Sequence, residues 1–200
     1  MTTKGRAMTE ALRHDLTARA RIRNSALALF ARHGVEGASM RRVAADAGVT
    51  VGLVVHHFGT KERLREEVET YVVDRFGAAI RSVPVQGSAR DVARGRDEAV
   101  ATMLATEPDL VTYLRRALLG LSGPDDHLLR RLTELAAEEV ARARAAGVAD
   151  TDRRGSTQTI RTMTRQLGQL LLQPMIDAMW EQLEGQSESP DKPALVVRVE

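Results

Sequence analysis

Apolar residues recur at helical spacing along almost the whole chain. The first predicted helix runs from about Thr17 to His33 and is ended by Gly34. One of its faces is apolar at positions i, i+4, i+7 and i+8, namely Ile22, Ala26, Leu29 and Phe30. The pattern therefore predicts an amphipathic helix with one buried stripe.

Three more predicted helices follow, and each is preceded by a hydroxyl residue that can cap its amino end. We expect them to begin after Ser39, Thr50 and Thr60. Gly48 and Gly59 end the first two, and the third is long, spanning about residues 61–82.

A short linker at residues 84–88 leads to four further helical stretches, at about residues 89–105, 108–120, 125–147 and 153–184. Pro174 lies inside the last stretch, where we expect a kink or a break into two helices. Only Ala194–Val199 has a β-like pattern. The sequence thus predicts an all-α fold, with an N-terminal three-helix head joined by a long helix to a C-terminal helical body.

The composition indicates a compartment. A hydrophobic fraction of 43% permits a core, and no run of about 18 apolar residues predicts a spanning helix. The first 20 residues lack the apolar centre of a secretory signal. The absence of cysteine excludes disulfides, a thiolate nucleophile and a cysteine-based zinc site. We therefore expect a cytoplasmic protein with no membrane partner, no metal and no cofactor.

The charge is divided unevenly along the chain. Residues 1–65 contain 12 Lys and Arg against 5 Asp and Glu, whereas residues 66–200 contain 17 against 22. A basic head suits a polyanion, because cations that neutralise phosphates release condensed counterions. The alternative is a chance excess of arginine on a solvated face.

Residues 39–58, SMRRVAADAGVTVGLVVHHF, have the pattern of a helix-turn-helix. Ala44 and Ala47 are small enough for two short helices to approach, and Gly48 permits a positive φ in the turn. Gly52 leaves the front of the next helix without a side chain, which suits a backbone pressed against DNA. On spacing alone, a chance occurrence of the A-x-x-x-G-V pattern is the alternative.

The stretch from Arg19 to about Leu64 resembles the N-terminal domain of the TetR family of bacterial regulators. The matching residues are Ile22, Ala26, Leu29, Phe30, Gly34, Ser39, Val43, Ala44, Ala47, Gly48, Val49, Gly52, His57, Phe58, Lys61 and Leu64. The resemblance implies a DNA-binding transcriptional regulator whose helical body senses a small-molecule effector and forms a homodimer.

The resemblance also implies a domain organisation. We expect a flexible N-terminal arm at residues 1–16, a helix-turn-helix DNA-binding domain at 17–64, a helical effector-binding and dimerisation domain at 65–186, and a C-terminal tail at 187–200. The basic residues of the arm could reach a minor groove. An ordinary disordered terminus is the alternative.

Individual contacts follow from the same resemblance. Base edges in the major groove are faced by the family residues that match Val51, Gly52 and Val55. Phosphates are held by those that match Thr50, His56, His57 and Lys61. Arg41 and Arg42 are further candidates for DNA contacts, with solvated surface positions as the alternative. The family usually has tyrosine where this chain has Val55, so we expect a different operator preference.

His56 and His57 do not predict a metal site. Adjacent residues on a helix point about 100° apart, so these two side chains cannot readily share one metal ion. Donation to phosphates is the better interpretation of both histidines.

The body contains no phosphate-binding loop and no catalytic motif, so we do not expect an enzyme. The resemblance implies an effector pocket there, and the candidate lining residues are Met103, Tyr113, Leu114, Arg116, Met163 and Leu167. Tyr113 or Arg116 could orient a ligand. The alternative for each of these residues is a filled core.

A second apolar stripe indicates pairing. Ile160, Met163, Leu167, Leu170, Leu171 and Pro174 recur at a spacing of three to four residues. We expect them to form the homodimer interface, since a palindromic operator requires a two-fold dimer. Only about three helical turns follow Pro174, so we expect the dimer to be smaller than is usual, or built mainly on the 153–173 helix.

The sequence therefore predicts a ligand-responsive transcriptional regulator. By the family's default it is a repressor that binds a palindromic double-stranded DNA operator as a homodimer and is released by a small-molecule effector. The alternative is a helical protein-interaction module that has kept the helix-turn-helix shape without DNA binding. Val55 in place of tyrosine favours this alternative.

Overall fold

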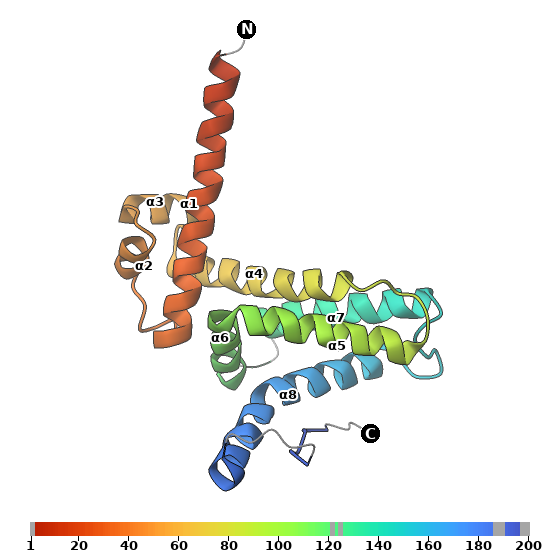
Figure 1. Ribbon diagram of the computed structural model, residues 1–200. Coiled ribbons are helices and arrows are strands. Elements are labelled where there is room, and N and C mark those ends of the chain that lie inside the picture. Colours follow the sequence, from red (N-terminus) through yellow and green to blue (C-terminus); the bar gives the residue numbers. More distant parts are fainter. Residues whose placement is uncertain (1–2, 121–122, 124–125, 186–190, 197–200) are drawn as a thin grey trace. The chain divides into compact units, whose positions relative to one another are not determined.

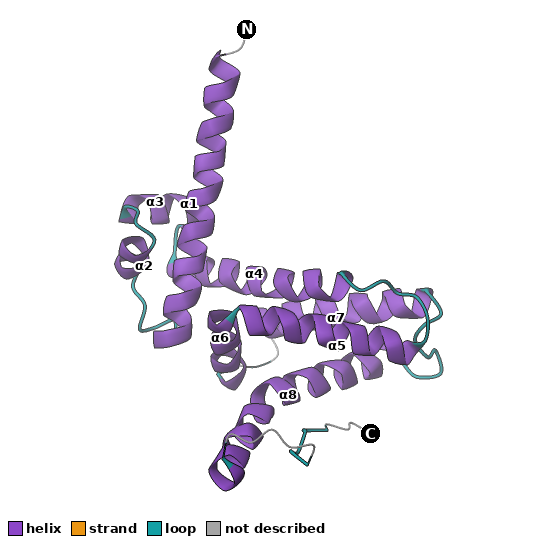
Figure 2. Ribbon diagram, viewed as in Figure 1, coloured by secondary structure: helices purple, strands orange, loops and turns teal. Residues whose placement is uncertain are grey.

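The computed structural model describes residues 3–120, 123, 126–185 and 191–196, with side chains from Thr17 onward. These residues form eight helices and no strand, which confirms the predicted all-α class (Figures 1 and 2). The helices are α1 Thr3–His33, α2 Met40–Asp46, α3 Val51–Phe58, α4 Lys61–Arg81, α5 Ala89–Thr106, α6 Pro108–Leu119, α7 His127–Ala145 and α8 Gly155–Glu184.

The three predicted helix caps are confirmed. In each, the hydroxyl oxygen accepts a hydrogen bond from the backbone N–H three residues later, at 3.2 Å. The three pairs are Ser39 with Arg42, Thr50 with Leu53, and Thr60 with Arg63. Local capping chemistry thus fixes where α2, α3 and α4 begin.

The predicted start of the first helix was wrong, because α1 begins at Thr3 instead of near Thr17. No proline interrupts residues 3–33, and Ala, Leu, Glu and Arg in this stretch favour helix. The segment predicted to be a flexible arm is therefore helical backbone from Thr3. Its contact with a minor groove stays a prediction.

The last helix passes through Pro174 without a break, so of the two predicted outcomes the break into two helices was wrong. The ribbon of α8 bends along its length (Figure 1). A proline inside a helix removes one backbone hydrogen bond and bends the axis in this way. Residues 194–196, the described part of the β-like Ala194–Val199, form no strand, and residues 197–199 lie outside the described residues.

The chain divides into two compact units. One comprises Met1–Ser82 and Glu98–Leu129, and the other comprises Val83–Asp97 and Arg130–Glu200. The predicted functional boundary at residue 64 and the tail at 187–200 stay predictions. In the first unit the fully buried side chains include Ile22, Phe30, Leu64, Leu110, Leu114 and Leu128. They come from α1, α4, α6 and α7.

A buried carboxylate joins three helices of the first unit. Glu69 of α4 is 3% exposed and accepts a hydrogen bond from the Tyr113 hydroxyl of α6 at 3.1 Å. Its second oxygen lies 2.7 Å from Nδ1 of His127 in the first turn of α7, and Arg65 lies 3.6 Å away. Burial, and next the charge of Glu69, raise the pKa of the Tyr113 hydroxyl far above its usual range.

The second unit also contains carboxylates that join helices through hydrogen bonds from arginines. Glu139 of α7 is 4% exposed and accepts from Arg96 of α5 at 3.2 Å, with Arg142 at 3.0 Å. Asp97 accepts from Arg165 of α8 at 3.1 Å. Polar contacts thus join α5 to both α7 and α8 within this unit.

Candidate nucleic-acid interface

Helices α2 and α3 are held by a small apolar core. The buried residues of α2 are Val43 and Ala44, and its cap residue Ala47 is buried too. Those of α3 are Val54 and Phe58. These two helices lie beside the carboxyl-terminal half of α1 (Figure 1). The scaffold predicted from residues 39–58 is therefore confirmed as two short helices on a shared core.

The turn between α2 and α3 is a Schellman motif. The N–H of Gly48 donates to Ala45 O at 3.2 Å, and the N–H of Val49 donates to Ala44 O at 2.9 Å. Gly48 has φ +63°, a conformation that an L side chain rarely adopts. Only Val49 separates this motif from the cap residue Thr50, so the turn has little conformational freedom.

The outer face of α3 is apolar and exposed. Val51 is 38% exposed, Val55 is 48% exposed, and Gly52 lies between them. Thr50 and His56 are also exposed, while His57 is half-buried. Methyl groups at Val51 and Val55 can contact a thymine methyl but cannot donate a hydrogen bond.

Gly52 has no internal reason to be glycine. Its φ lies outside the left-handed region, and an added Cβ would meet only Thr50 Oγ1, at 3.9 Å. Glycine in a helix costs about 1 kcal/mol relative to alanine. At this position a second surface could approach the backbone of α3 without meeting a side chain.

Two of the predicted cations already have protein partners. Lys61 Nζ donates to Glu36 Oε2 at 3.3 Å, and Glu36 is 95% exposed. Arg42 Nη2 lies 2.9 Å from His33 Nε2. Arg41 is exposed. An ion pair to so exposed a glutamate is weak, so a phosphate can compete for Lys61.

The adjacent histidines remain separate. The ring centroids of His56 and His57 lie 5.4 Å apart at an interplanar angle of 66°. Within the described residues, no group of three or more His, Cys, Asp or Glu side chains is arranged to hold a metal ion. Likewise, no helix in the described part of the chain has the length and apolarity to cross a membrane.

Sequence reasoning missed three side-chain contacts around the helix-turn-helix. Arg21 of α1 binds the turn before α3, Arg19 pairs with Glu67 of α4 at 2.8 Å, and Glu36 pairs with Lys61. All three join residues at least 25 positions apart. Nothing in the local sequence marks such partners, although the run of arginines on α1 was visible.

The six predicted effector-lining residues fall into different surroundings. Met103, Tyr113 and Leu114 are buried in the core of the first unit. Arg116 is exposed and donates to the backbone oxygen of Arg32 at 3.4 Å. Met163 and Leu167 are half-buried on α8 of the second unit. The structure therefore does not gather these six around one described pocket, and their role stays a prediction.

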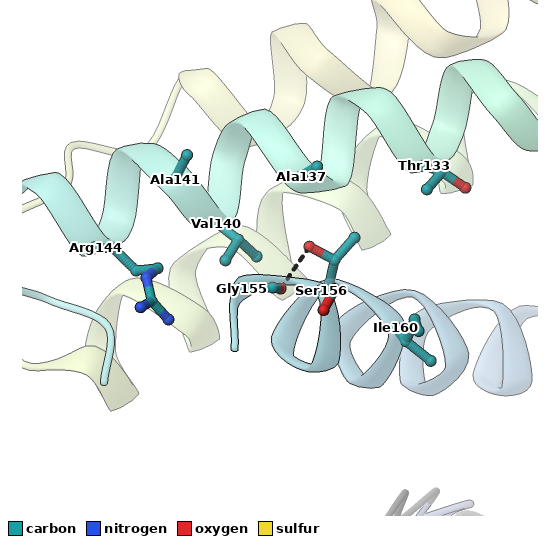
Figure 3. Close-up of a pocket in the computed structure, with 9 residues that line it drawn as sticks. Thr133, Ala137, Val140, Ala141, Arg144, Gly155, Ser156 and Ile160 are labelled. Atoms are coloured by element: carbon teal, nitrogen blue, oxygen red, sulfur yellow. Dashed lines mark hydrogen bonds between the residues drawn. The ribbon is translucent and has the colours of Figure 1, made fainter. Parts of the chain in front are cut away.

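A pocket of about 580 Å³ lies within the second unit, between α7 and the first turns of α8 (Figure 3). The lining residues of α7 are Thr133, Ala137, Val140, Ala141 and Arg144, and those of α8 are Gly155, Ser156, Thr159 and Ile160. Thr159 is buried and donates to Gly155 O at 2.9 Å. Of the residues predicted for the dimer interface, only Ile160 lines this pocket.

Apolar side chains of α8 extend beyond the pocket. Ile160 is 57% exposed, and the other predicted interface residues are half-buried, namely Met163, Leu167, Leu170, Leu171 and Pro174. The structure adds four exposed residues that sequence reasoning did not select, which are Leu172, Met175, Met179 and Leu183.

The fold and the site define a class: an all-helical protein whose N-terminal unit contains a helix-turn-helix with an exposed second helix. The family profile "Bacterial regulatory proteins, tetR family" matches residues 22–68. This segment contains α2, α3 and the amino-terminal turns of α4. Residues 22–68 are therefore similar to the N-terminal segment of the tetR family of bacterial regulatory proteins.

Two curated relatives match short stretches of the chain. The HTH-type transcriptional regulatory protein RaaS of Mycobacterium tuberculosis is 48% identical over 62 residues, which is 31% of this chain and 29% of RaaS. The HTH-type transcriptional repressor AcnR of Corynebacterium efficiens is 43% identical over 49 residues, 24% of this chain and 26% of AcnR. The chain thus matches less than a third of the length of either relative.

Solved structures extend the likeness of fold to the body. A tetR family transcription regulator from Shewanella sp. PV-4 aligns with a TM-score of 0.65 at 21% identity, covering 84% of this chain and 89% of that one. The fatty acid degradation regulator FadR from Bacillus halodurans aligns with a TM-score of 0.61 at 18% identity, covering 85% and 87%. At these identities the likeness concerns the fold alone.

Proposed function

We propose that this chain is a transcriptional regulator that binds a palindromic DNA operator as a homodimer, and that it is a repressor released by a small-molecule effector. The observation that carries the DNA-binding part is the exposed face of α3. There, Gly52 lacks a side chain without any internal steric reason, between exposed Val51 and Val55. A short, exposed helix whose backbone can be approached at Gly52 suits the major groove.

Gly52→Ala tests this interpretation directly. If α3 is exposed but does not contact DNA, alanine raises helix stability by about 0.5–1 kcal/mol and leaves DNA binding unchanged. If α3 enters the groove, the same substitution stabilises the free protein and weakens DNA binding by at least about tenfold, because the methyl group displaces the backbone from the bases. Affinity is measured by fluorescence anisotropy on a duplex that the wild type selects from a random library.

Thr112→Ala is the matched control, since Thr112 is an exposed position of α6 where alanine also raises helix propensity. It should raise stability without weakening DNA binding. A Gly52→Ala protein that retains full affinity contradicts the proposed contact. If folded wild-type protein selects no duplex at low salt, the alternative of a protein-interaction module takes its place.

The homodimer is supported by surface chemistry in the second unit. Helix α8 carries exposed Ile160, Leu172, Met175, Met179 and Leu183. Beside its first turns lies the apolar pocket edged by Thr133, Ala137 and Ala141 of α7 (Figure 3). Large side chains on one helix and small ones on its neighbour are the surfaces that interlock when helix pairs associate. A two-fold axis lets each copy supply both.

Met175→Glu tests this interface, because it places a charge in the middle of the exposed apolar stripe. We expect the variant to sediment as a monomer at micromolar concentrations at which the wild type is a dimer. Its DNA affinity should fall at least about tenfold, since two half-sites are no longer bound together. Gln169→Glu, an exposed position outside the stripe, is the control. A Met175→Glu dimer of undiminished stability contradicts the assignment.

Repression and effector release form the remaining part of the proposal. In a reporter strain carrying the selected duplex within a promoter, expression of the wild-type chain should lower transcription, and Gly52→Ala should restore it. An increase in transcription on expression of the wild type indicates an activator instead. A compound that dissociates the wild-type protein from the duplex identifies the effector class.

A further inference from the structure

Arg21 is a cation that contacts the helix-turn-helix from outside it. The residue lies on α1, and its Nη2 donates to the backbone oxygens of both Ala47, at short range, and Gly48, at 3.2 Å. These two residues form the end of α2 and the turn before α3. One guanidinium nitrogen therefore bridges two successive carbonyls of the turn.

The two carbonyls are not acceptors in the Schellman motif itself. The Schellman motif uses the oxygens of Ala44 and Ala45 as acceptors for the amides of Val49 and Gly48. The oxygens of Ala47 and Gly48 lie beyond it, at the negative end of the α2 dipole, where a cation is favourable. Arg21 thus donates to two carbonyls of the turn that the motif does not use.

Gly48 makes room for this contact. A Cβ at Gly48 would lie 3.1 Å from Arg21 Nη2, closer than nine in ten ordinary Cβ contacts. The glycine is required by its positive φ and also leaves space for the guanidinium. Since Thr50 begins the cap of α3 two residues later, the position of Gly48 determines where the amino end of α3 lies.

We propose that Arg21 is a positioning residue, which rests on the proposed DNA-binding function. By fixing the turn to α1, it sets the angle at which Val51, Gly52 and Val55 are presented to the bases, and it does not itself hold a phosphate. A loosened α3 can still lie against the charged backbone of any duplex. It loses the register that base contacts require.

The test compares Arg21→Gln with Arg32→Gln, which removes the same charge from an exposed position of the same helix. Affinity is measured on the wild-type-selected duplex and on a scrambled duplex of equal length, at four salt concentrations. We expect Arg21→Gln to reduce the ratio of the two affinities on the order of tenfold, with the salt dependence changed no more than in Arg32→Gln. Arg21→Lys, which can still donate to one carbonyl, should restore part of the ratio.

Hydrogen exchange in the free protein supplies a readout that needs no DNA. Arg21→Gln should speed exchange of the amides of Val49, Leu53 and Val54, and Arg32→Gln should leave them unchanged. If Arg21→Gln lowers binding to both duplexes equally and flattens the salt slope by about one unit beyond Arg32→Gln, Arg21 holds a phosphate and the proposal is wrong. Unchanged exchange and an unchanged affinity ratio also overturn it. A wild type that selects no duplex refutes the proposed function instead, and the exchange result still decides whether Arg21 fixes the turn.

Discussion

The two longest helices, α1 and α8, have similar lengths and opposite surroundings. The apolar stripe of α1 is buried inside the first unit, where Ile22, Ala26 and Phe30 are 0% exposed. On α8 the one buried residue is Thr159, while Leu172 and Met175 are about half exposed. From Thr17 onward, the apolar face of α1 is therefore covered within its own chain. The last helix exposes an apolar surface whose burial would stabilise an assembly, which is why we assign recognition of DNA to one unit and pairing to the other.

The largest expected effect separates these two helices. Ile22→Ala should lower the free energy of unfolding by about 2–5 kcal/mol, because it leaves a cavity in a fully buried site. Leu172→Ala should change the unfolding of the dilute monomer by less than about 0.5 kcal/mol. Urea denaturation at two protein concentrations measures both. If Leu172→Ala lowers the unfolding free energy of the monomer as much as Ile22→Ala does, Leu172 is already packed within the monomer. The exposed surface of α8 is then not a dimer interface.

Removal of the buried carboxylate of α4 should have the next largest effect. Glu69→Ala deprives Tyr113 and His127 of their shared acceptor, and we expect a loss of about 3 kcal/mol in unfolding free energy. Glu66→Ala, an exposed position of the same helix, should cost less than about 0.5 kcal/mol. Equal effects of the two substitutions in thermal and urea unfolding would show that the buried network adds nothing to the stability of the first unit.

Alkaline pH should weaken the first unit through its tyrosines. Burial raises the pKa of Tyr113 above the ordinary value of 10.0. It also raises the pKa of Tyr71, which is less deeply buried. A group whose pKa is raised on folding contributes stability below its unfolded pKa and loses it as the pH rises above that value. Unfolding free energy should therefore fall above about pH 10, by up to about 1.4 kcal/mol per pH unit for Tyr113.

The two tyrosines provide each other's control. Tyr113→Phe should reduce the alkaline slope of unfolding free energy more than Tyr71→Phe, because Tyr113 is 3% exposed and Tyr71 is half-buried. The measurement is urea unfolding at intervals between pH 8 and pH 11. A steeper dependence on Tyr71 than on Tyr113 would contradict the order of burial.

The parts of this molecule that the sequence predicted are those governed by neighbouring residues. Ser39, Thr50 and Thr60 cap helices through bonds to amides three residues away, so both the helix starts and the exposed face of α3 could be predicted. The unbroken α8 depended on local chemistry too, but proline allows either a bend or a break, and the sequence did not decide between them.

Contacts between distant residues could not be predicted in the same way. Arg21 reaches the turn 26 residues later, Glu69 meets His127 across 58, and Arg116 reaches Arg32 O across 84. Tyr113 or Arg116 was predicted to orient an effector, and the contact of Arg116 with the carboxyl end of α1 could not be seen in the sequence. The same limit applies to the predicted effector set, because periodicity identifies an apolar face without identifying what packs on it.

The smallest expected effect concerns the ion pair of Glu36 with Lys61, which is a predicted phosphate contact. Glu36→Gln removes the partner of Lys61, and because Glu36 is 95% exposed the unfolding free energy should change by less than about 0.5 kcal/mol. DNA affinity should rise about twofold at low salt. Lys61 then does not have to give up a carboxylate partner before it binds a phosphate, and the unit proposed to bind DNA has one negative charge fewer.

Glu134→Gln is the control. It makes the same charge change at an exposed position of α7 in the other unit, and its effect on DNA affinity should be smaller. Equal gains from the two variants would mean that total charge alone matters. A loss of affinity in Glu36→Gln would mean that the pair holds Lys61 in its binding position, so that the glutamate assists the contact.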